Sequence, residues 1–249
     1  MLAIVSALPE EISLVVEQLA GASTHDVGRR TFHVGTFHGV DAVAVFSGWG
    51  KVAAAVTVTQ LIASFPITRL VFSGVAGAVR HGLAIGDVVI ATGLLQHDMD
   101  ASPIFPRYEV PLLGKFLFEP DAELRARLER AAREFLTHDL HAQVEARELA
   151  FFQIRSPKVA GGVIASGDKF FASAAAVAEL RDRLPIVACV EMEGAAVAQV
   201  CEEYGIAFGV VRTLSDSADE NSPHDFPRFA RAIARHYSAG VLREFVREL

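Results

Sequence analysis

The chain has 249 residues, and 51% of them are hydrophobic, which is enough to bury one large core or two small ones and excludes a disordered or fibrous protein. With 23 basic and 30 acidic residues the formal net charge is −7. Lysine and arginine form no cluster, so nucleic acid and anionic membranes are poor partners for this chain.

The two cysteines, Cys189 and Cys201, lie in apolar stretches, which is typical of reduced core residues in a cytoplasmic protein. We therefore expect no structural metal, and nothing in the sequence calls for a cofactor. Residues 1–11 contain no basic leader and no long apolar region, so they are not expected to be a signal peptide. The charge-free stretch 52–68 is too short and too polar to span a bilayer.

Short apolar runs rich in β-branched residues alternate with longer helical patterns, as in an α/β sheet covered on both faces. In chain order, strands are predicted at Leu2–Ala7, Thr31–Phe37, Ala42–Phe46, Leu70–Ser73, Asp87–Thr92, Ala160–Ile164, Ile186–Val190 and Phe208–Arg212. The junction Phe37–Val40 has the sequence of a hairpin turn, which predicts a mixed sheet.

Helices are predicted between these strands and at the end of the chain, at Glu10–Leu19, Val52–Ala63, Asp121–Leu136, Ala174–Arg183, Gly194–Tyr204 and Phe226–Arg247. The last one has the clearest apolar stripe, with a large apolar residue every three or four positions. No internal repeat and no linker rich in glycine and serine interrupts the chain. The pattern predicts a single domain over residues 1–249 with a three-layer α/β/α architecture around a central mixed β-sheet.

The segment Met99–Glu119 has prolines that break regular structure and is predicted to be one long loop. It carries the large apolar side chains Ile104, Phe105, Tyr108 and Phe116. Loops that are this long and this aromatic are usually functional or lie at an interface.

Ligands of an open α/β sheet bind beyond the carboxyl ends of its strands, so polar residues at these positions are candidates for a site. Five such groups follow predicted strands: Glu10–Glu11, Ser73–Gly77, Ser166–Phe171, Glu191–Glu193 and Arg212–Asp216. Each group also has a purely structural explanation, because acidic residues favour helix starts, Ser and Asp favour turns and caps, and glycines let a strand turn tightly. Their recurrence at the same edge favours a binding site.

These groups belong to a longer series of motifs in a fixed order along the chain. The series reads Ala7–Glu11, Ser47–Val52, Ser73–Gly77, Gly86–Val89, Gln96–Asp100, Ser166–Asp168, Val190–Ala196 and Val211–Asp216. It resembles the ordered motifs of the 5′-methylthioadenosine/S-adenosylhomocysteine nucleosidases, which belong to the purine nucleoside phosphorylase family. The resemblance covers nearly the whole chain and implies the nucleoside phosphorylase/hydrolase fold.

The resemblance implies a hydrolytic N-glycosidase that acts on a purine nucleoside. Cleavage of the bond between ribose and adenine passes through an oxocarbenium-like state, so an enzyme must neutralise the departing base, stabilise the cationic sugar and deliver water. By similarity, Asp216 is the general acid that protonates adenine N7. This role requires that the Asp216 carboxyl group keep its proton, which burial or neighbouring carboxylates would favour. Arg212 would oppose this protonation if it pointed at Asp216.

By the same similarity, Glu11 orients and deprotonates the attacking water. Glu10 beside it would be a helix-start carboxylate, and it is the alternative base if the motif is misaligned. Glu193 should accept hydrogen bonds from the ribose hydroxyls, while Met192 packs under the sugar.

For the purine, the resemblance implies that Phe170 stacks on the ring and that the backbone of Phe171 reads its edge, although both residues would also suit the core. Ser215 is expected among the substrate-binding residues. Val75 stands where relatives have a serine, so one hydrogen bond to the nucleophilic water is expected to be missing. Arg212, which matches a family residue near that water, and the backbone are expected to compensate.

The resemblance also implies a homodimer in which Phe105 and Tyr108 close the pocket of the partner subunit; self-packing of their loop is the alternative. Gly48–Lys51 lacks the spacing of a nucleotide-binding loop and is expected to turn a strand into a helix. His97–Asp100 resembles a set of metal ligands, but a loop hydrogen-bond network is favoured.

Three alternatives to hydrolysis of these thio-nucleosides stay open on the sequence. A phosphorylase would need arginine and small-residue donors for phosphate, whereas the first loop here is Leu8–Glu11 and is acidic. A hydrolase of another purine nucleoside such as futalosine would differ in its 5′ pocket. A nucleoside-binding protein without catalysis would not require an acid and a base on opposite sides of the bond.

Overall fold

The computed structural model describes residues 1–216 and 222–249, and within them the strands form one nine-stranded sheet. The strands are β1 (Leu2–Ser6), β2 (Leu19–Val27), β3 (Arg30–Phe37), β4 (Val40–Phe46), β5 (Arg69–Ala78), β6 (Val88–Gln96), β7 (Val159–Ser166), β8 (Val187–Glu191) and β9 (Ala207–Asp216). Their order in the sheet is β2-β3-β4-β1-β5-β8-β7-β6-β9.

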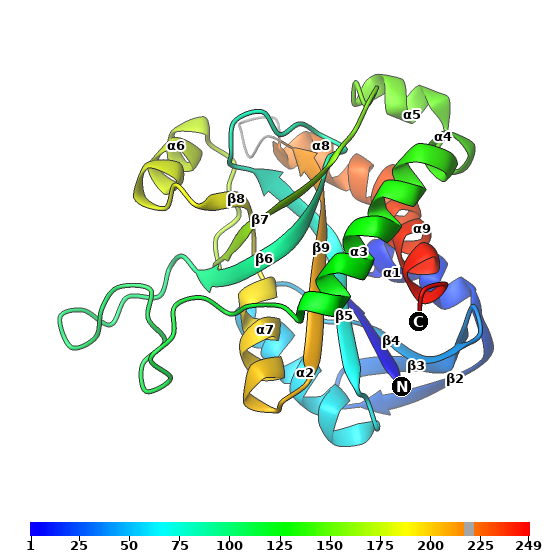
Figure 1. Cartoon of the computed structure of the whole chain (residues 1–249), viewed down its shortest axis with the longest axis horizontal. Coiled ribbons are helices and arrows are strands. Elements are labelled where there is room, and N and C mark those ends of the chain that lie inside the picture. Colours follow the sequence, from blue (N-terminus) through cyan, green and yellow to red (C-terminus); the bar gives the residue numbers. More distant parts are fainter. Residues whose placement is uncertain (217–221) are drawn as a thin grey trace.

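The sheet is mixed and closes on itself at one side, because β5 pairs with β9 as well as with β8. β1 runs parallel to β4 and β5, and β5 runs parallel to β9. β8 is antiparallel to β5, and β6 is antiparallel to β9. The strands β5 to β9 therefore form the closed part of the sheet. Strands β1 to β4 extend this sheet beyond β5 as an open, unclosed part (Figure 1).

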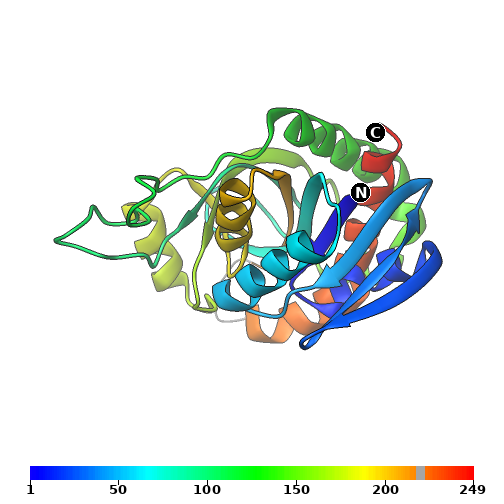
Figure 2. The same ribbon diagram turned by 90° about the horizontal axis from the view of Figure 1, so that it is seen from below.

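Helices cover both faces of the sheet, which confirms the predicted α/β fold with a central mixed sheet. The helices are α1 (Pro9–Glu17), α2 (Lys51–Ser64), α3 (Ala122–Glu134), α4 (Leu140–Gln143), α5 (Ala146–Phe151), α6 (Ala174–Arg183), α7 (Gly194–Glu203), α8 (Ser222–Phe229) and α9 (Arg235–Val246), with π-helical turns at Phe135–Asp139 and Ala230–Ala234. One core cluster buries apolar residues of α1, α3 and α9, and a second buries those of α2 and α7. Helices α2 and α7 lie side by side in Figure 2.

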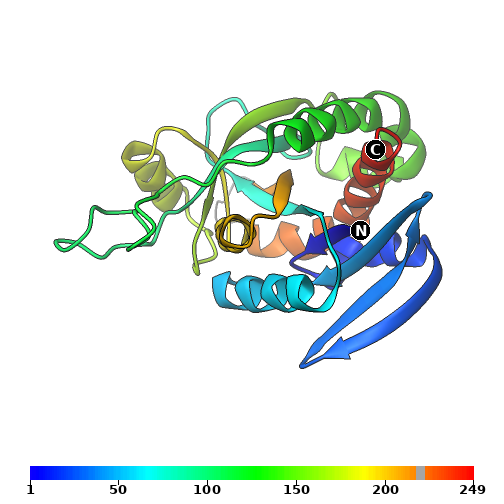
Figure 3. The same cartoon turned by 60° about the horizontal axis from the view of Figure 1, so that its bottom comes forward.

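Two predictions about connections are confirmed. Phe37 and Val40 pair across an antiparallel hairpin whose turn residues His38 and Gly39 have φ values of 46° and 91°. Residues 99–119 form an irregular segment that projects from the body of the molecule (Figure 3). None of the helices in the described part of the chain is long and apolar enough to cross a membrane.

The structure also differs from the predicted elements. β2 was not predicted, because seven of its nine residues are exposed and no alternating apolar pattern marks it. The short helices α4 and α5 were missed, and the predicted helix over 226–247 is broken by a π-helical turn. β9 continues to Asp216, so the polar residues predicted to follow this strand are part of it.

Candidate active site

The sheet register itself brings the candidate residues together. Gly77 of β5 pairs with Asp216 of β9 on one side and with Val190 of β8 on the other. Glu191, Met192 and Glu193 follow Val190 directly, so β5, β8 and β9 meet at one pocket. This pocket is lined by Ala7, Leu8, Glu11, Trp49, Val75, Ala76, Gly77, Lys169, Phe170, Phe171, Val190, Glu191, Met192, Glu193, Ser215, Asp216 and Phe226.

Glu11 occupies one side of the pocket on the first turn of α1 and is buried. Its Oε2 accepts hydrogen bonds from the backbone N–H groups of Ala7 and Leu8 at 3.0 and 2.9 Å, and its Oε1 accepts one from Val75 at 3.0 Å. Burial raises the pKa of Glu11 above its usual value, although Arg212 and the three backbone donors partly offset this. The result is a fixed carboxylate with an increased affinity for a proton.

A buried ion pair lies beneath this side of the pocket. Arg212 donates from Nη2 to Glu191 Oε2 at 2.8 Å, and its guanidinium stacks 4.0 Å from the ring centre of Phe72. Both side chains are at most 3% exposed. Arg212 lies outside the set of pocket-lining residues, so its predicted contact with the substrate stays a prediction and the structure gives it a supporting position.

Glu191 organises the turn that carries the next two site residues. Its carboxylate accepts hydrogen bonds from the backbone N–H groups of Glu193 and Gly194 and from the hydroxyl of Ser166. The sequence singled out Glu191 by position but assigned it no part in the reaction. Its contacts show an acceptor that fixes the Met192–Glu193 turn at the pocket.

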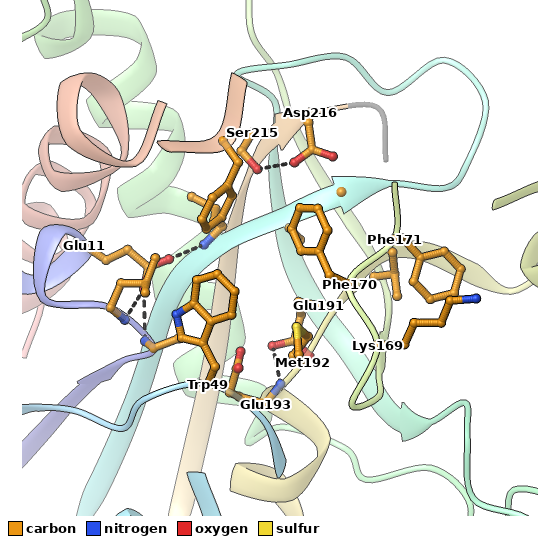
Figure 4. Close-up of a pocket in the computed structure, with 17 residues that line it drawn as sticks. Glu11, Trp49, Lys169, Phe170, Phe171, Glu191, Met192, Glu193, Ser215 and Asp216 are labelled. Carbon is orange, nitrogen blue, oxygen red and sulfur yellow. Dashed lines mark hydrogen bonds between the residues drawn. The ribbon is translucent and has the colours of Figure 1, made fainter. Parts of the chain in front are cut away.

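Glu193 lies on the lower side of the pocket in Figure 4 and is buried. Its Oε1 accepts a hydrogen bond from the backbone N–H of Gly50 at 2.7 Å. Burial, reinforced by the negative charge of Glu191, raises the pKa of Glu193 to about 8. Met192 lines the same wall, so a carboxylate and a thioether face the pocket side by side.

Asp216 lies at the end of β9, on a different side of the pocket from Glu11 (Figure 4). The Ser215 hydroxyl donates to Asp216 Oδ2 at 2.6 Å, and both residues are buried. Both line the pocket, as the sequence predicts.

Aromatic rings form the remaining wall. Phe226 of α8 packs edge to face against Trp49 and Phe170, with ring centres 5.9 and 5.8 Å apart. Phe170 is 37% exposed, whereas Phe171 is buried and packs edge to face against His97. Phe170 is therefore available to a ligand ring, and Phe171 has the core packing that was its alternative explanation.

The pocket contains most of the predicted residues and several that the sequence did not select. Glu11, Val75, Phe170, Phe171, Met192, Glu193, Ser215 and Asp216 all line it. Leu8, Trp49 and Lys169 belong to motifs that the sequence singles out but have no predicted role, and Phe226 is predicted only as part of the last helix. The segment Gly48–Lys51 does turn a strand into α2, as predicted.

Phe105 and Tyr108 lie on the projecting segment and outside the set of lining residues. Tyr108 packs against the small core cluster that contains Phe171. Their contact with a partner subunit stays a prediction. The predicted hydrogen-bond network around His97–Asp100 is present, since Asp98 accepts from Lys51 and Asp100 accepts from Ser102.

Comparison with known proteins agrees with this geometry. The chain matches the family model of the Phosphorylase superfamily over residues 1–247. It is 35% identical over 249 residues to the 5′-methylthioadenosine/S-adenosylhomocysteine nucleosidase of Chromohalobacter salexigens, covering 100% of this chain and 97% of that protein. The crystal structure of the corresponding nucleosidase from Neisseria meningitidis, in complex with methylthio-immucillin-A, matches with a TM-score of 0.87 and 33% identity, covering 100% of this chain and 99% of that one.

The native structure of futalosine hydrolase from Helicobacter pylori is similar to nearly the same degree, with a TM-score of 0.84 and 32% identity over 100% of this chain and 97% of that one. Fold and site together define an enzyme that cleaves N-glycosidic bonds of nucleosides. The chain belongs to the 5′-methylthioadenosine/S-adenosylhomocysteine nucleosidase family of the Phosphorylase superfamily.

Proposed function

We propose that this protein hydrolyses the N-glycosidic bond of 5′-methylthioadenosine, S-adenosylhomocysteine or both, releasing adenine and a 5-thioribose derivative. The observation that carries the proposal is the convergence of Glu11, Glu193 and Asp216 on one pocket that also holds Met192 and an exposed aromatic ring. The similarity to nucleosidases with this named substrate specificity supports the choice of substrate.

Asp216 is the proposed general acid. It donates its proton to adenine N7 while the bond between C1′ and N9 breaks, so the electron pair of that bond leaves with a neutral base. The Ser215 hydroxyl donates to Asp216 Oδ2 and so fixes this carboxyl group at the end of β9. Phe170, which is partly exposed in the same wall, supplies the stacking surface for the base.

Glu11 is the proposed general base. Its carboxylate accepts a proton from the water whose oxygen attacks C1′, and the raised pKa of Glu11 suits this step. Glu10 has no place in the pocket lining, which favours Glu11 over its neighbour. The backbone N–H groups of Ala7, Leu8 and Val75 are directed at Glu11, so these donors are occupied by an internal carboxylate. A phosphate ion at this end would face that negative charge, which favours water as the nucleophile.

Glu193 and Met192 are the proposed ribose site. A Glu193 carboxylate accepts hydrogen bonds from the ribose hydroxyls, and these bonds strengthen as positive charge develops on the ring. Met192 offers a polarizable apolar surface under the sugar. The pair thus stabilises the oxocarbenium-like state between the acid on one side and the base on the other.

We further propose that the working form is a homodimer in which Phe105 and Tyr108 reach the pocket of the partner subunit. Exposed apolar side chains on the projecting segment support this, since Ile104 and Leu112 are 83% and 93% exposed. Trp49, Val52 and Val56 add an exposed apolar strip at the start of α2.

The test is release of free base from a panel of nucleosides. The purified protein is incubated without phosphate with 5′-methylthioadenosine, S-adenosylhomocysteine, adenosine, inosine and futalosine, and the base is followed by chromatography. We expect adenine from the two thio-nucleosides at the highest rates. Release of base from futalosine alone would support the second candidate, which the similarity to a futalosine hydrolase favours.

A further inference from the structure

Three charged residues form a cluster at the border of the pocket without lining it. Lys51 is the first residue of α2, Asp98 follows β6, and Asp168 follows β7. Lys51 Nζ donates to Asp98 Oδ1 at 2.6 Å and lies 3.8 Å from Asp168 Oδ2. It also donates to Gln96 Oε1 at 3.2 Å. The lysine side chain is only 16% exposed, so its ammonium group is largely enclosed by these acceptors.

The cluster is closed by backbone hydrogen bonds. The N–H of Asp168 donates to Asp98 Oδ2 at 2.9 Å, and the N–H of Lys51 donates to Asp168 Oδ1 at 2.8 Å. Each of the three residues therefore contacts the other two. Partial burial would raise the pKa of Asp98, but the hydrogen bonds from Lys51 and Asp168 lower it below its usual value. We call Lys51, Asp98 and Asp168 the charged clamp, because their contacts join three segments that are distant in sequence.

The clamp acts on both sides of the pocket. Asp168 lies two residues before Phe170, so holding Asp168 holds the loop that presents the aromatic surface. Lys51 follows Gly50, whose N–H donates to Glu193 at 2.7 Å. Gly50 has a φ of 88°, and a Cβ there would lie 2.9 Å from Asp168 Oδ1, so the loop and the start of α2 are in close contact.

We propose that Lys51 is a positioning residue that couples the purine side of the pocket to the ribose side, through Asp98 and Asp168. It holds the loop of Phe170 against the start of α2 and thereby keeps the Gly50 N–H on Glu193. This inference rests on the proposed function for its catalytic consequences. It makes a residue outside the pocket a determinant of substrate affinity.

Loss of the clamp has two distinct consequences. The aromatic loop is released, so binding of the base weakens. The Gly50 N–H, which lowers the proton affinity of Glu193, is no longer held in place, so Glu193 is protonated at higher pH. A substitution that only loosened the packing around Lys51, without moving the Phe170 loop or the Gly50 N–H, would change neither base binding nor the protonation of Glu193.

The experiment uses the intact protein and its single tryptophan, Trp49, which lines the pocket next to Gly50. Lys51→Met removes the ammonium group and keeps most of the aliphatic stem. Lys158→Met is the matched control, because Lys158 is exposed directly before β7 and donates to the carbonyl of Gly82, and neither residue lines the pocket. Adenine is titrated against Trp49 fluorescence, and KM, kcat and the pH profile are measured with 5′-methylthioadenosine.

For Lys51→Met we expect adenine binding to weaken about tenfold or more, since small displacements of positioning groups are amplified at a site. KM should rise by a larger factor than kcat falls, and the acid limb of kcat/KM should move to higher pH. Lys51→Arg should restore most of the affinity, because arginine can still donate to both carboxylates. Lys158→Met should match the wild type in every measurement.

The proposal is overturned if Lys51→Met behaves like the wild type. That result means an adenine affinity and a KM within about twofold of the wild-type values, and a pH profile shifted by less than about 0.2 pH unit. If Lys51→Met does not fold, Asp168→Ala replaces it, because the Asp168 side chain is 51% exposed and its removal breaks the clamp at low cost to stability. A wild type that binds adenine but releases no base would refute the proposed function alone. A wild type that neither binds adenine nor turns over would refute both.

Discussion

The two ends of the pocket are built in different ways. Glu11, at the proposed water side, is held by three backbone N–H groups from the first loop and from β5, above the buried pair of Arg212 and Glu191. Asp216, at the proposed purine side, ends a strand and faces Phe170, which lies on a loop held by the charged clamp. Backbone donors of the first loop and of β5 thus fix the Glu11 carboxylate, whereas Phe170 of the purine side lies on a loop that follows β7.

Because of this difference, substitutions on the two sides should have different effects on the stability of the fold and on the reaction rate. A change at Glu11 disturbs hydrogen bonds that also hold the core, so it should affect both folding and rate. A change at Asp216 or Phe170 should affect rate and affinity with little effect on folding. The following substitutions test this separation, from the largest expected effect to the smallest.

Asp216→Asn should have the largest effect on turnover. The amide keeps an oxygen for the Ser215 hydroxyl but has no acidic proton for N7. We expect kcat to fall by roughly 10³-fold, within the range for loss of a general acid. The melting temperature and the adenine affinity, followed by Trp49 fluorescence, should stay near the wild-type values. A turnover number close to that of the wild type would remove the acid role from Asp216.

Glu11→Gln should reduce kcat by about 10²-fold, because the amide cannot accept the proton of water. It should also lower stability by about 1–3 kcal/mol, since whichever terminal atom becomes the NH2 group then faces a backbone donor. Chemical denaturation measures the second effect. Unimpaired hydrolysis would assign the base to another group, and wild-type stability together with lost activity would contradict the account of how this side is built.

Glu193 should give the protein a pH dependence of intermediate size. Its pKa of about 8 lies above the usual glutamate value of 4.5, so between these two pH values the folded protein holds a proton that the unfolded chain has released. Stability should therefore fall as the pH rises from about 5 to 8, while ribose binding by the carboxylate should improve. Glu193→Gln should flatten the stability profile and remove the rising limb of kcat/KM. Identical profiles for the two proteins would contradict this assignment.

Val75→Ser should have the smallest effect. Val75 lines the pocket beside Glu11, and its backbone N–H rather than its side chain holds that carboxylate. An added hydroxyl can bond to the nucleophilic water, so we expect kcat to be unchanged or to rise by up to about threefold. A large loss of stability would show that the Val75 side chain is a core residue.

The fold was largely predictable because its buried strands are continuous apolar runs. β1, β5 and β8 read as such from the sequence, and their helices carry apolar stripes. β2 was not predictable in this way, because pairing with β3 stabilises a strand whose own residues are mostly exposed. The closure of β5 onto β9 depends on long-range pairing, which local patterns do not encode.

The site was predictable where function requires particular residue types after strands. Glu11 and Glu193 lie in groups that follow β1 and β8, Asp216 ends β9, and the family resemblance singled out these three residues within their groups. The pairing of Arg212 with Glu191 was not, since the two residues lie 21 positions apart and meet only through β9, β5 and β8. Trp49 and Phe226 have no predicted role either, because their place at the pocket depends on how the turn before α2 packs against α8.

The central claim is that water attacks C1′ with help from Glu11, in a pocket whose negative charge excludes phosphate. The most direct measurement is the mass of the sugar product formed from 5′-methylthioadenosine in the presence of excess phosphate. We predict free 5-methylthioribose, at a rate that phosphate does not increase. A sugar 1-phosphate as the main product would contradict the account and place phosphate where the structure holds the Glu11 carboxylate.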